Sequence, residues 1–251
     1  INNGALIRSA AGDTTGGLFY IADIRIEADT ANGHVTKWYD QSGNDNHAAP
    51  STPSSQPKIV DGGTLVTDAG KPTMDSTNGS LEKLNFTIGN ASAQYSAFLV
   101  GQRFTETTGR GFWGLGNADA WGLTNTGTAG EMQVSGVTAT GYDTTSTLLH
   151  SQINDGTNTN IFRDGSSVGA GLTTAPYTNQ TTQTLRIGAS RFVSRVVASS
   201  LQEVIIYNSD QSDNRRAIES DIASHYGISV PALNGYVSTW YDQSGNGNNA
   251  L

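Results

Sequence analysis

Short runs in which apolar and polar residues alternate recur along the chain, and clusters of Gly, Asn, Asp and Thr separate them. Alternation with a period of two puts one apolar face on a core, which is typical of half-buried β-strands. Serial short strands indicate a sandwich or barrel. The expected strands are Val35–Tyr39, Leu84–Ile88, Tyr95–Phe104, Gly111–Leu115, Met132–Val137, Leu148–Ile153, Asn160–Arg163, Thr184–Ile187 and Leu201–Tyr207.

A tight turn is expected at Asp164-Gly165, between the strand-like runs NIFR and SSV. A two-residue type I′ turn requires positive φ at both central residues, and Asp-Gly is among the dipeptides that tolerate this best. The dipeptide therefore predicts a β-hairpin.

One segment has helical periodicity instead. In Asp210–Tyr226, the apolar residues Ile218, Ile222 and Tyr226 recur every four residues and form one stripe. Ser209 or Ser212 is expected to cap the N-terminus, where the acidic residues of the first turn suit the helix dipole. Gly227 supplies a left-handed residue after the last turn. The pattern predicts one amphipathic helix that closes the domain.

The chain also contains a self-match. Residues 32–48 read NGHVTKWYDQSGNDNHA and residues 234–250 read NGYVSTWYDQSGNGNNA, with twelve of the seventeen positions identical at an offset of 202. An offset of this size matches a whole domain rather than a solenoid repeat. We therefore expect one domain over residues 1–228, followed by a linker and the opening strand of a second repeat copy over 229–251.

Two interpretations of that C-terminal strand are possible. Val237, Trp240 and Tyr241 alternate with polar residues, so the strand has an apolar face that an unpaired strand would expose. It is expected to pair with a sheet edge of its own or of a neighbouring chain, which makes neighbouring chains candidate partners. The alternative is a complete second domain that continues beyond Leu251.

Three segments resemble concanavalin A-like lectin/glucanase domains of the laminin-G-like type. These segments are VTKWYDQSGNDNHA with the following QPKIV and GKPTM, then FRDGSSVG, and finally SLQEVIIYNSDQSDNRRAIESDIASHYGI. The resemblance implies an all-β antiparallel jelly-roll sandwich with one C-terminal amphipathic helix. The stretch YDQSGN is also similar to a motif of arabinofuranosidase catalytic domains. Fold resemblance does not transfer function, which depends on sites.

The composition of the chain indicates where the protein acts and which classes of partner it excludes. Charged residues are 14% of the chain, against roughly 25% in ordinary globular domains. A surface covered by short polar residues is typical of β-rich extracellular, cell-surface and virion proteins. The net charge of −8 and the absence of a basic face argue against nucleic acid. No apolar run approaches the roughly 20 residues of a membrane span. The chain has no cysteines, so no thiolate metal site is expected.

The loop after the first expected strand has two interpretations. Asp40, Ser42, Asn44 and Asn46 present oxygens at alternate positions, as calcium-binding loops do. The loop lacks a bidentate Glu at the right distance. The preferred interpretation is an Asx-turn in which Asp40 and Asn44 bond nearby backbone N–H groups. No cofactor is therefore expected, and Ca²⁺ is the alternative.

Aromatic residues beside small polar ones form the candidate ligand site. Sugars stack their C–H faces on aromatic rings while Asp and Asn side chains bond their hydroxyls. Trp121 lies near Asp119 and Asn117 in the sequence, and Trp113 lies in Gly111-Phe112-Trp113-Gly114. The alternative is that both tryptophans fill the core, which is the preferred interpretation for Trp113.

Catalysis is disfavoured. A glycosidase needs two carboxylates across the scissile bond, and the candidates Asp119, Glu131, Asp143 and Asp155 all lie in turn-rich contexts. The arabinofuranosidase resemblance implies an acid after the strand that reads LRIG here, but this chain has Ala189-Ser190-Arg191. The paired cysteines of that family are absent too. Glu203 is expected to face solvent or to pair with an Arg.

The sequence thus predicts a non-catalytic surface or virion module that binds glycans, such as a cell-surface polysaccharide, or mediates adhesion. Two alternatives stay open. One is a purely structural assembly or decoration domain of a virion or filament. The other is a glycoside hydrolase of the arabinofuranosidase kind.

Overall fold

The structure of the chain is a computed structural model. It describes residues 16–20, 32–77, 79–88, 94–103, 111–115, 124–125, 128, 130–134, 137–141, 146–172, 180–190 and 199–232. The predicted segment 234–250 lies outside these ranges, and of the predicted linker and opening strand over 229–251 only residues 229–232 are described.

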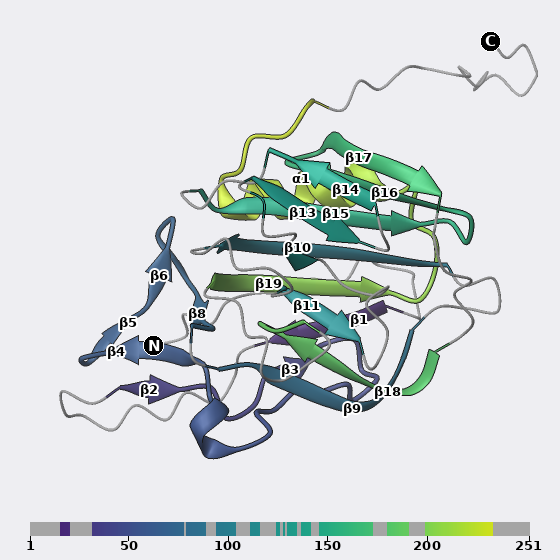
Figure 1. The fold of residues 1–251 in the computed structure, drawn as a ribbon. Coiled ribbons are helices and arrows are strands. Elements are labelled where there is room, and N and C mark those ends of the chain that lie inside the picture. The colour runs from purple at the N-terminus through teal and green to yellow at the C-terminus, as the bar shows by residue number, and fades with distance from the viewer. Residues whose placement is uncertain are drawn as a thin grey trace, which may run out of the picture.

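A large antiparallel sheet organises the fold (Figure 1). Its strands, in spatial order, are β17 (Ser166–Leu172), β16 (Asn158–Arg163), β15 (Leu148–Asn154), β10 (Tyr95–Arg103), β19 (Ser199–Tyr207), β8 (Met74–Asp75), β4 (Lys58–Asp61) and β2 (Gly33–His34). Three more strands extend it: β1 (Gly16–Tyr20) pairs with β19 and with β3 (Tyr39–Asp40), and β5 (Thr64–Leu65) pairs with β4.

Two smaller sheets form a second layer on one face of the large sheet (Figure 1). One has the order β11 (Trp113–Leu115), β18 (Gln180–Ile187), β9 (Leu81–Ile88), and the other has β12 (Thr124–Asn125), β13 (Glu131–Val134), β14 (Val137–Thr140). The short ribbon of β6 (Thr67–Asp68) and β7 (Lys71–Pro72) and the 3₁₀ turn at Pro53–Ser55 complete the elements. The chain passes repeatedly between the layers: β9, β11–β14 and β18 lie in the second layer, and β10, β15–β17 and β19 lie in the large sheet. The predicted all-β antiparallel sandwich is confirmed.

The core fills the space between the layers and continues on the opposite face of the large sheet, where a helix covers it (Figure 1). Strands β15 and β19 are buried at every position. A strand covered on both faces loses the polar–apolar alternation of a half-exposed strand. Glu203 is therefore buried on β19 at 4% exposure, and the expectation that it faces solvent is wrong.

Within the described ranges the only α-helix is α1 (Arg215–Tyr226). It begins five residues after the predicted start because Asp210 forms a local turn, in which its carboxylate accepts hydrogen bonds from the Ser212 N–H (2.9 Å) and hydroxyl (2.6 Å). The N-cap is Asn214, without a side-chain cap bond, and neither predicted serine has this role. Gly227 ends the helix in the left-handed conformation, as predicted. No helix in the described part of the chain is long and apolar enough to cross a membrane.

One predicted turn is confirmed, and one predicted strand is wrong. Asp164 and Gly165 have φ of 48° and 75° and connect the paired strands β16 and β17, so the predicted hairpin is confirmed. The expected single strand Met132–Val137 is two strands instead, because Val134 ends β13 and pairs with Val137, the first residue of β14. In the sequence, Val137 breaks the alternation of Met132 and Val134, and Ser135-Gly136 is a dipeptide typical of turns, so the end of β13 had a local signal that the expected single strand overlooked.

Candidate functional site

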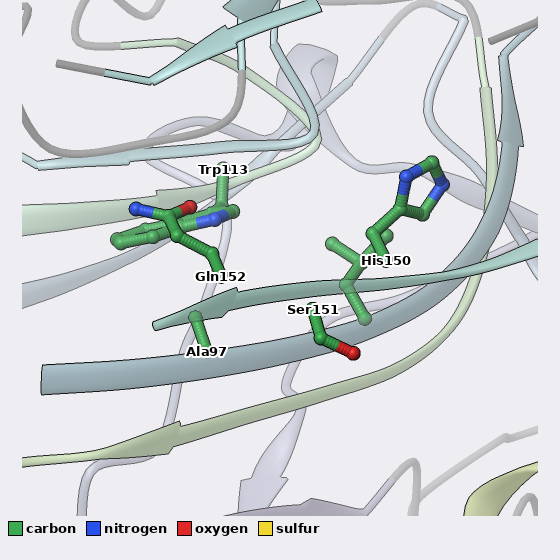
Figure 2. A pocket seen from close by; sticks show the side chains of 6 residues that line it. Ala97, Trp113, His150, Ser151 and Gln152 are labelled. Atoms are coloured by element: carbon green, nitrogen blue, oxygen red, sulfur yellow. The ribbon is translucent and has the colours of Figure 1, made fainter. Parts of the chain in front are cut away.

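A small pocket lies between the large sheet and the second layer (Figure 2). The space inside it that a water-sized group can reach is about 10 Å³, and its lining residues are Ala97, Leu99, Trp113, His150, Ser151 and Gln152. A single water molecule needs roughly 10–15 Å³ of such space. The pocket therefore accommodates about one water-sized group, such as a hydroxyl, rather than a whole ligand.

Strand pairing explains why these side chains meet. In the antiparallel pair β10–β15, Ala97 is opposite Gln152 and Leu99 is opposite His150, so all four share one face. Ala97 is the small member of the set and leaves space above the sheet. Ser151 alternates to the other face, and Figure 2 shows it pointing away from Trp113. The pocket is thus set by register and by one small residue.

Aromatic rings form the wall contributed by the second layer. Trp113 on β11 is 2% exposed, and its ring meets that of Tyr95 edge-on at a centroid distance of 6.2 Å. Phe112, the neighbouring residue, lies 4.8 Å from the His150 ring. Edge-to-face packing of this kind fixes ring positions as well as burying area. Trp113 is therefore held in a fixed position, and almost none of its ring is exposed.

Gln152 provides the polar group of the pocket. Its side chain is 3% exposed, and its NH₂ group donates a hydrogen bond to the Tyr95 hydroxyl. Its carbonyl oxygen has no hydrogen-bond partner among the described residues. Figure 2 shows the amide lying against the Trp113 ring. Because a Tyr hydroxyl both donates and accepts, exchanging the amide O and N would still leave one amide atom unpartnered.

A buried amide atom without a partner costs free energy, and a ligand that bonds it recovers that energy. The pocket therefore combines an apolar ring with an available hydrogen-bonding group. None of its six lining residues carries a carboxylate.

The structure describes only part of the predicted ligand site. Trp113 lies in the core, which is the preferred of its two interpretations, and it also lines the pocket. Asn117, Asp119 and Trp121 lie outside the described residues. Gln152 and His150 were missed at the sequence level, because the run LLHSQIN shows only a strand with polar residues in it.

The loop after β3 has the geometry of the predicted Asx-turn. The Asp40 carboxylate accepts hydrogen bonds of 2.8 Å from the Ser42 N–H, the Ser42 hydroxyl and the Asn46 N–H. The Ser42 hydroxyl oxygen accepts the Asn44 N–H at 3.1 Å. Backbone donors thus already occupy both carboxylate oxygens. Across the described ranges, no group of three or more His, Cys, Asp or Glu side chains is arranged to hold a metal ion. That the turn needs no Ca²⁺ stays a prediction.

Two of the predicted carboxylate candidates are described. Asp155 lies in the β15–β16 turn and accepts the N–H groups of Thr157 (2.8 Å) and Asn158 (2.6 Å). Burial by itself raises the pKa of Asp155, but these hydrogen bonds outweigh it and leave the pKa below its usual value. Glu131 is half-buried on β13. Asp119 and Asp143 lie outside the described residues.

The strongest electrostatic feature lies on the other face of the large sheet. Burial beneath α1 raises the pKa of Glu203 to about 8; the Tyr226 hydroxyl bonds the carboxyl and opposes the rise, and the charge of Asp221 adds to it. Burial also raises the pKa of Tyr226. This pair belongs to the packing of α1 on the sheet and does not line the pocket.

Comparison with known proteins gives the fold alone. No protein-family model matches the chain, and no curated protein matches its sequence. Among solved structures, Trypanosoma rangeli sialidase in complex with the inhibitor DANA is similar, with a TM-score of 0.54 and 11% identity over 84% of this chain and 32% of that one. The same sialidase in complex with sialic acid gives 0.50 and 10% over 87% and 33%. The chain spans about a third of that enzyme.

A further similar structure is the binding domain of Paraclostridial Mosquitocidal Protein 1, with a TM-score of 0.49 and 10% identity over 84% of this chain and 51% of that domain. The sialidase comparison, at 10–11% identity, bears on the fold alone, and a site must supply the function.

Proposed function

We propose that this domain is a non-catalytic module that binds glycans at the pocket beside Trp113. One observation carries the proposal: the Gln152 amide is 3% exposed, lies in a pocket against an indole ring and keeps one atom without a partner in the described residues. A sugar hydroxyl that enters the pocket satisfies the amide atom, whereas the sugar ring stays outside because the indole of Trp113 is only 2% exposed.

The sequence supports an extension of this site along the chain. Trp113 begins β11, and Asn117, Asp119 and Trp121 follow that strand in the sequence. The pocket holds one small group, so a glycan needs further contacts outside it. An indole with neighbouring amide and carboxylate groups has the composition to supply them.

The fold is compatible with this assignment at the level of analogy. The three segments that resemble concanavalin A-like lectin domains span most of residues 33–228, and a sialidase whose complex with sialic acid is known shares the fold. Fold analogy guides the choice of the first glycans to test and does not establish which glycan binds. Sialosides, arabinosides and bacterial polysaccharides are the glycans to test first.

The setting we propose is a cell surface, an extracellular assembly or a virion, where glycan binding produces adhesion. The low content of charged residues, 14%, supports it. The non-catalytic part rests on Ala189-Ser190-Arg191, which stand where the arabinofuranosidase resemblance implies an acid. Release of nitrophenol from nitrophenyl-arabinoside would overturn that part.

A glycan array with three variants tests the site. Gln152→Met keeps the volume but removes the hydrogen bond, and we expect about tenfold weaker binding of the best glycan. Trp121→Ala removes the stacking ring and should cost on the order of 1–3 kcal/mol of binding free energy. Gln133→Met, at a half-buried glutamine of β13, is the control and should bind as the parent does.

Unfolding curves for all three variants separate lost binding from lost folding. If a folded Gln152→Met chain binds the best glycan as tightly as the parent, the pocket is not the site. If only Trp121→Ala binds normally, the site is the pocket without the extension.

A further inference from the structure

The first copy of the repeated motif, residues 32–48, forms the border of the large sheet; we call it the first segment. It packs on β4 and the residues beside it, 56–62, which we call the β4 edge. The Val35 N–H donates to the Pro57 carbonyl at 2.9 Å, and the Asn32 side-chain oxygen accepts the Gly62 N–H at 3.0 Å. Gly33 and His34 pair with Val60 and Lys58. Most of these bonds use backbone atoms, which any matching segment repeats.

The second copy, residues 234–250, keeps all four residues that are buried in the first segment; we call it the tail segment. The buried positions of the first segment are Val35, Trp38, Asp40 and Ala48, and the tail segment has Val237, Trp240, Asp242 and Ala250 there. Trp38 is 0% exposed. Asn234 repeats the Asn32 side chain that bonds Gly62.

The five differences fall where the structure tolerates them. Three of them, Tyr236, Ser238 and Gly247, replace exposed residues, and Thr239 and Asn249 replace half-buried ones. Gly247 replaces Asp45, whose φ is 54°, and glycine adopts that conformation with less strain. Asn249 replaces His47, which accepts the Asp40 N–H at 3.0 Å, and an Asn side-chain oxygen is an equivalent acceptor.

One position is under a sharper constraint. A Cβ at Gly33 would lie 2.9 Å from Cβ and Cγ2 of Val60, so only glycine fits against the β4 edge. The tail segment also has glycine at this position, Gly235. The tail segment therefore meets the steric condition for docking on β4 as well as the burial condition.

Ala232, the last described residue before the tail segment, lies far from the β4 edge of its own chain. Arg216 bonds the carbonyls of Pro231 and Ala232, and Pro231 adjoins Gly165 at the β16–β17 turn. From β16 to β4 the sheet order has five steps of about 4.8 Å, or roughly 24 Å. Figure 1 shows β17 and β4 on opposite sides of the molecule. Gly235 is three residues beyond Ala232 and can extend only about 11 Å.

We propose that the tail segment of one copy of this chain docks on the β4 edge of a second copy, in place of that copy's first segment. The contact is head-to-tail, so repetition links copies into an open row rather than a closed dimer. Trp240 takes the position of Trp38, and Gly235 lies against Val60.

Concentration controls this exchange. The first segment is attached to its own edge with an effective concentration on the order of 1 mM, and the tail of a neighbour competes at the protein concentration. With nearly equal intrinsic affinities, exchange is about 1% at 10 μM and about half at 1 mM. Trp38→Ala weakens the first segment by roughly 100-fold or more. Exchange in that variant is then about half at 10 μM.

Disulfide trapping tests the contact directly, because the full chain has no cysteines. His34 is the strand partner of Lys58, so docking of the tail places Tyr236 opposite Lys58 at a spacing that suits a disulfide. The variant Lys58→Cys/Tyr236→Cys is oxidised at 1 mM, and also at 100 μM in the Trp38→Ala background. We expect a ladder of disulfide-linked oligomers in both.

Each single-cysteine variant is a control and can give no more than a dimer. Adding Gly235→Val, which clashes with Val60, should abolish the ladder, whereas Ser238→Val at an exposed position should leave it intact. The parent background at 1 mM keeps the test valid if Trp38→Ala does not fold. A ladder that Gly235→Val leaves unchanged, an intramolecular 58–236 disulfide in a monomer, or no ladder in either background would overturn the proposal.

Discussion

Substituting Glu203 by Gln isolates the effect of one buried acid on stability. Glu203 lies on β19 beneath α1 at 4% exposure, and burial raises its pKa from 4.5 to about 8, with a smaller contribution from the charge of Asp221 and opposition from the Tyr226 hydrogen bond. The carboxyl is therefore protonated in the folded chain at neutral pH. In the unfolded chain it is ionised.

The sign follows from proton binding. Between pH 4.5 and about 8 the folded state holds a proton on Glu203 that the unfolded state does not, so stability decreases as pH rises through this window. Below pH 4.5 both states are protonated and this loss is absent. Above about pH 8 the loss is complete, on the order of 5 kcal/mol at 1.36 kcal/mol per pH unit. Gln keeps the shape and removes the titration.

Urea unfolding at pH 5, 7 and 9 measures the effect. We expect the stability of Glu203→Gln relative to the parent to increase by several kcal/mol from pH 5 to pH 9. The control Asp213→Asn removes an exposed acid just before α1 and should follow the parent closely at all three values. If Glu203→Gln and the parent give parallel pH profiles, the carboxyl is not protonated in the folded chain and the reasoning is refuted.

Three further results are expected. Addition of EDTA should leave the thermal midpoint unchanged because the 40–46 turn is held by its own hydrogen bonds; a large fall that Ca²⁺ restores would establish a metal site. Ile222→Ala should cost about 2–5 kcal/mol in urea unfolding, and half-buried Ile218→Ala less, since Ile222 faces the core; equal losses would contradict this packing. Arg186→Met should lower the free energy of unfolding by on the order of 3 kcal/mol, because it leaves the carboxylate of Glu82, 2.8 Å from Arg186, buried without its ion-pair partner. Adding Glu82→Leu to the same chain should recover part of this loss. If the effects of the two substitutions simply add, the two side chains are not coupled.

Local signals predicted the elements whose causes are local. The Asp164-Gly165 turn was predictable because positive φ at two successive residues is a property of those residues. The end of α1 at Gly227 was predictable for the same reason. Short alternating runs predicted strands, and their number and spacing predicted a sandwich.

Features that depend on distant partners were not predictable. The start of α1 is displaced to Arg215 because Asp210 bonds Ser212 and because the Ser96 hydroxyl of β10 accepts the Gln211 N–H at 2.9 Å. The capping pattern in the sequence shows the first of these bonds and cannot show the second. The pocket was not predictable either, since Gln152 and Ala97 become neighbours only through strand register.

The sequence by itself thus determined the class of fold, the turn at Asp164-Gly165 and the existence of a repeated motif. The period of the apolar residues, the conformational preferences of turn residues and the identity between two segments can all be read directly from the sequence. The tertiary structure alone decided which strand is covered on both faces. That decision buried Glu203 and raised its pKa, and it brought Gln152 beside Trp113. It also showed that the repeated motif keeps the residues that are buried in its first copy. Burial and proximity depend on elements far apart in the chain, and no local pattern records them.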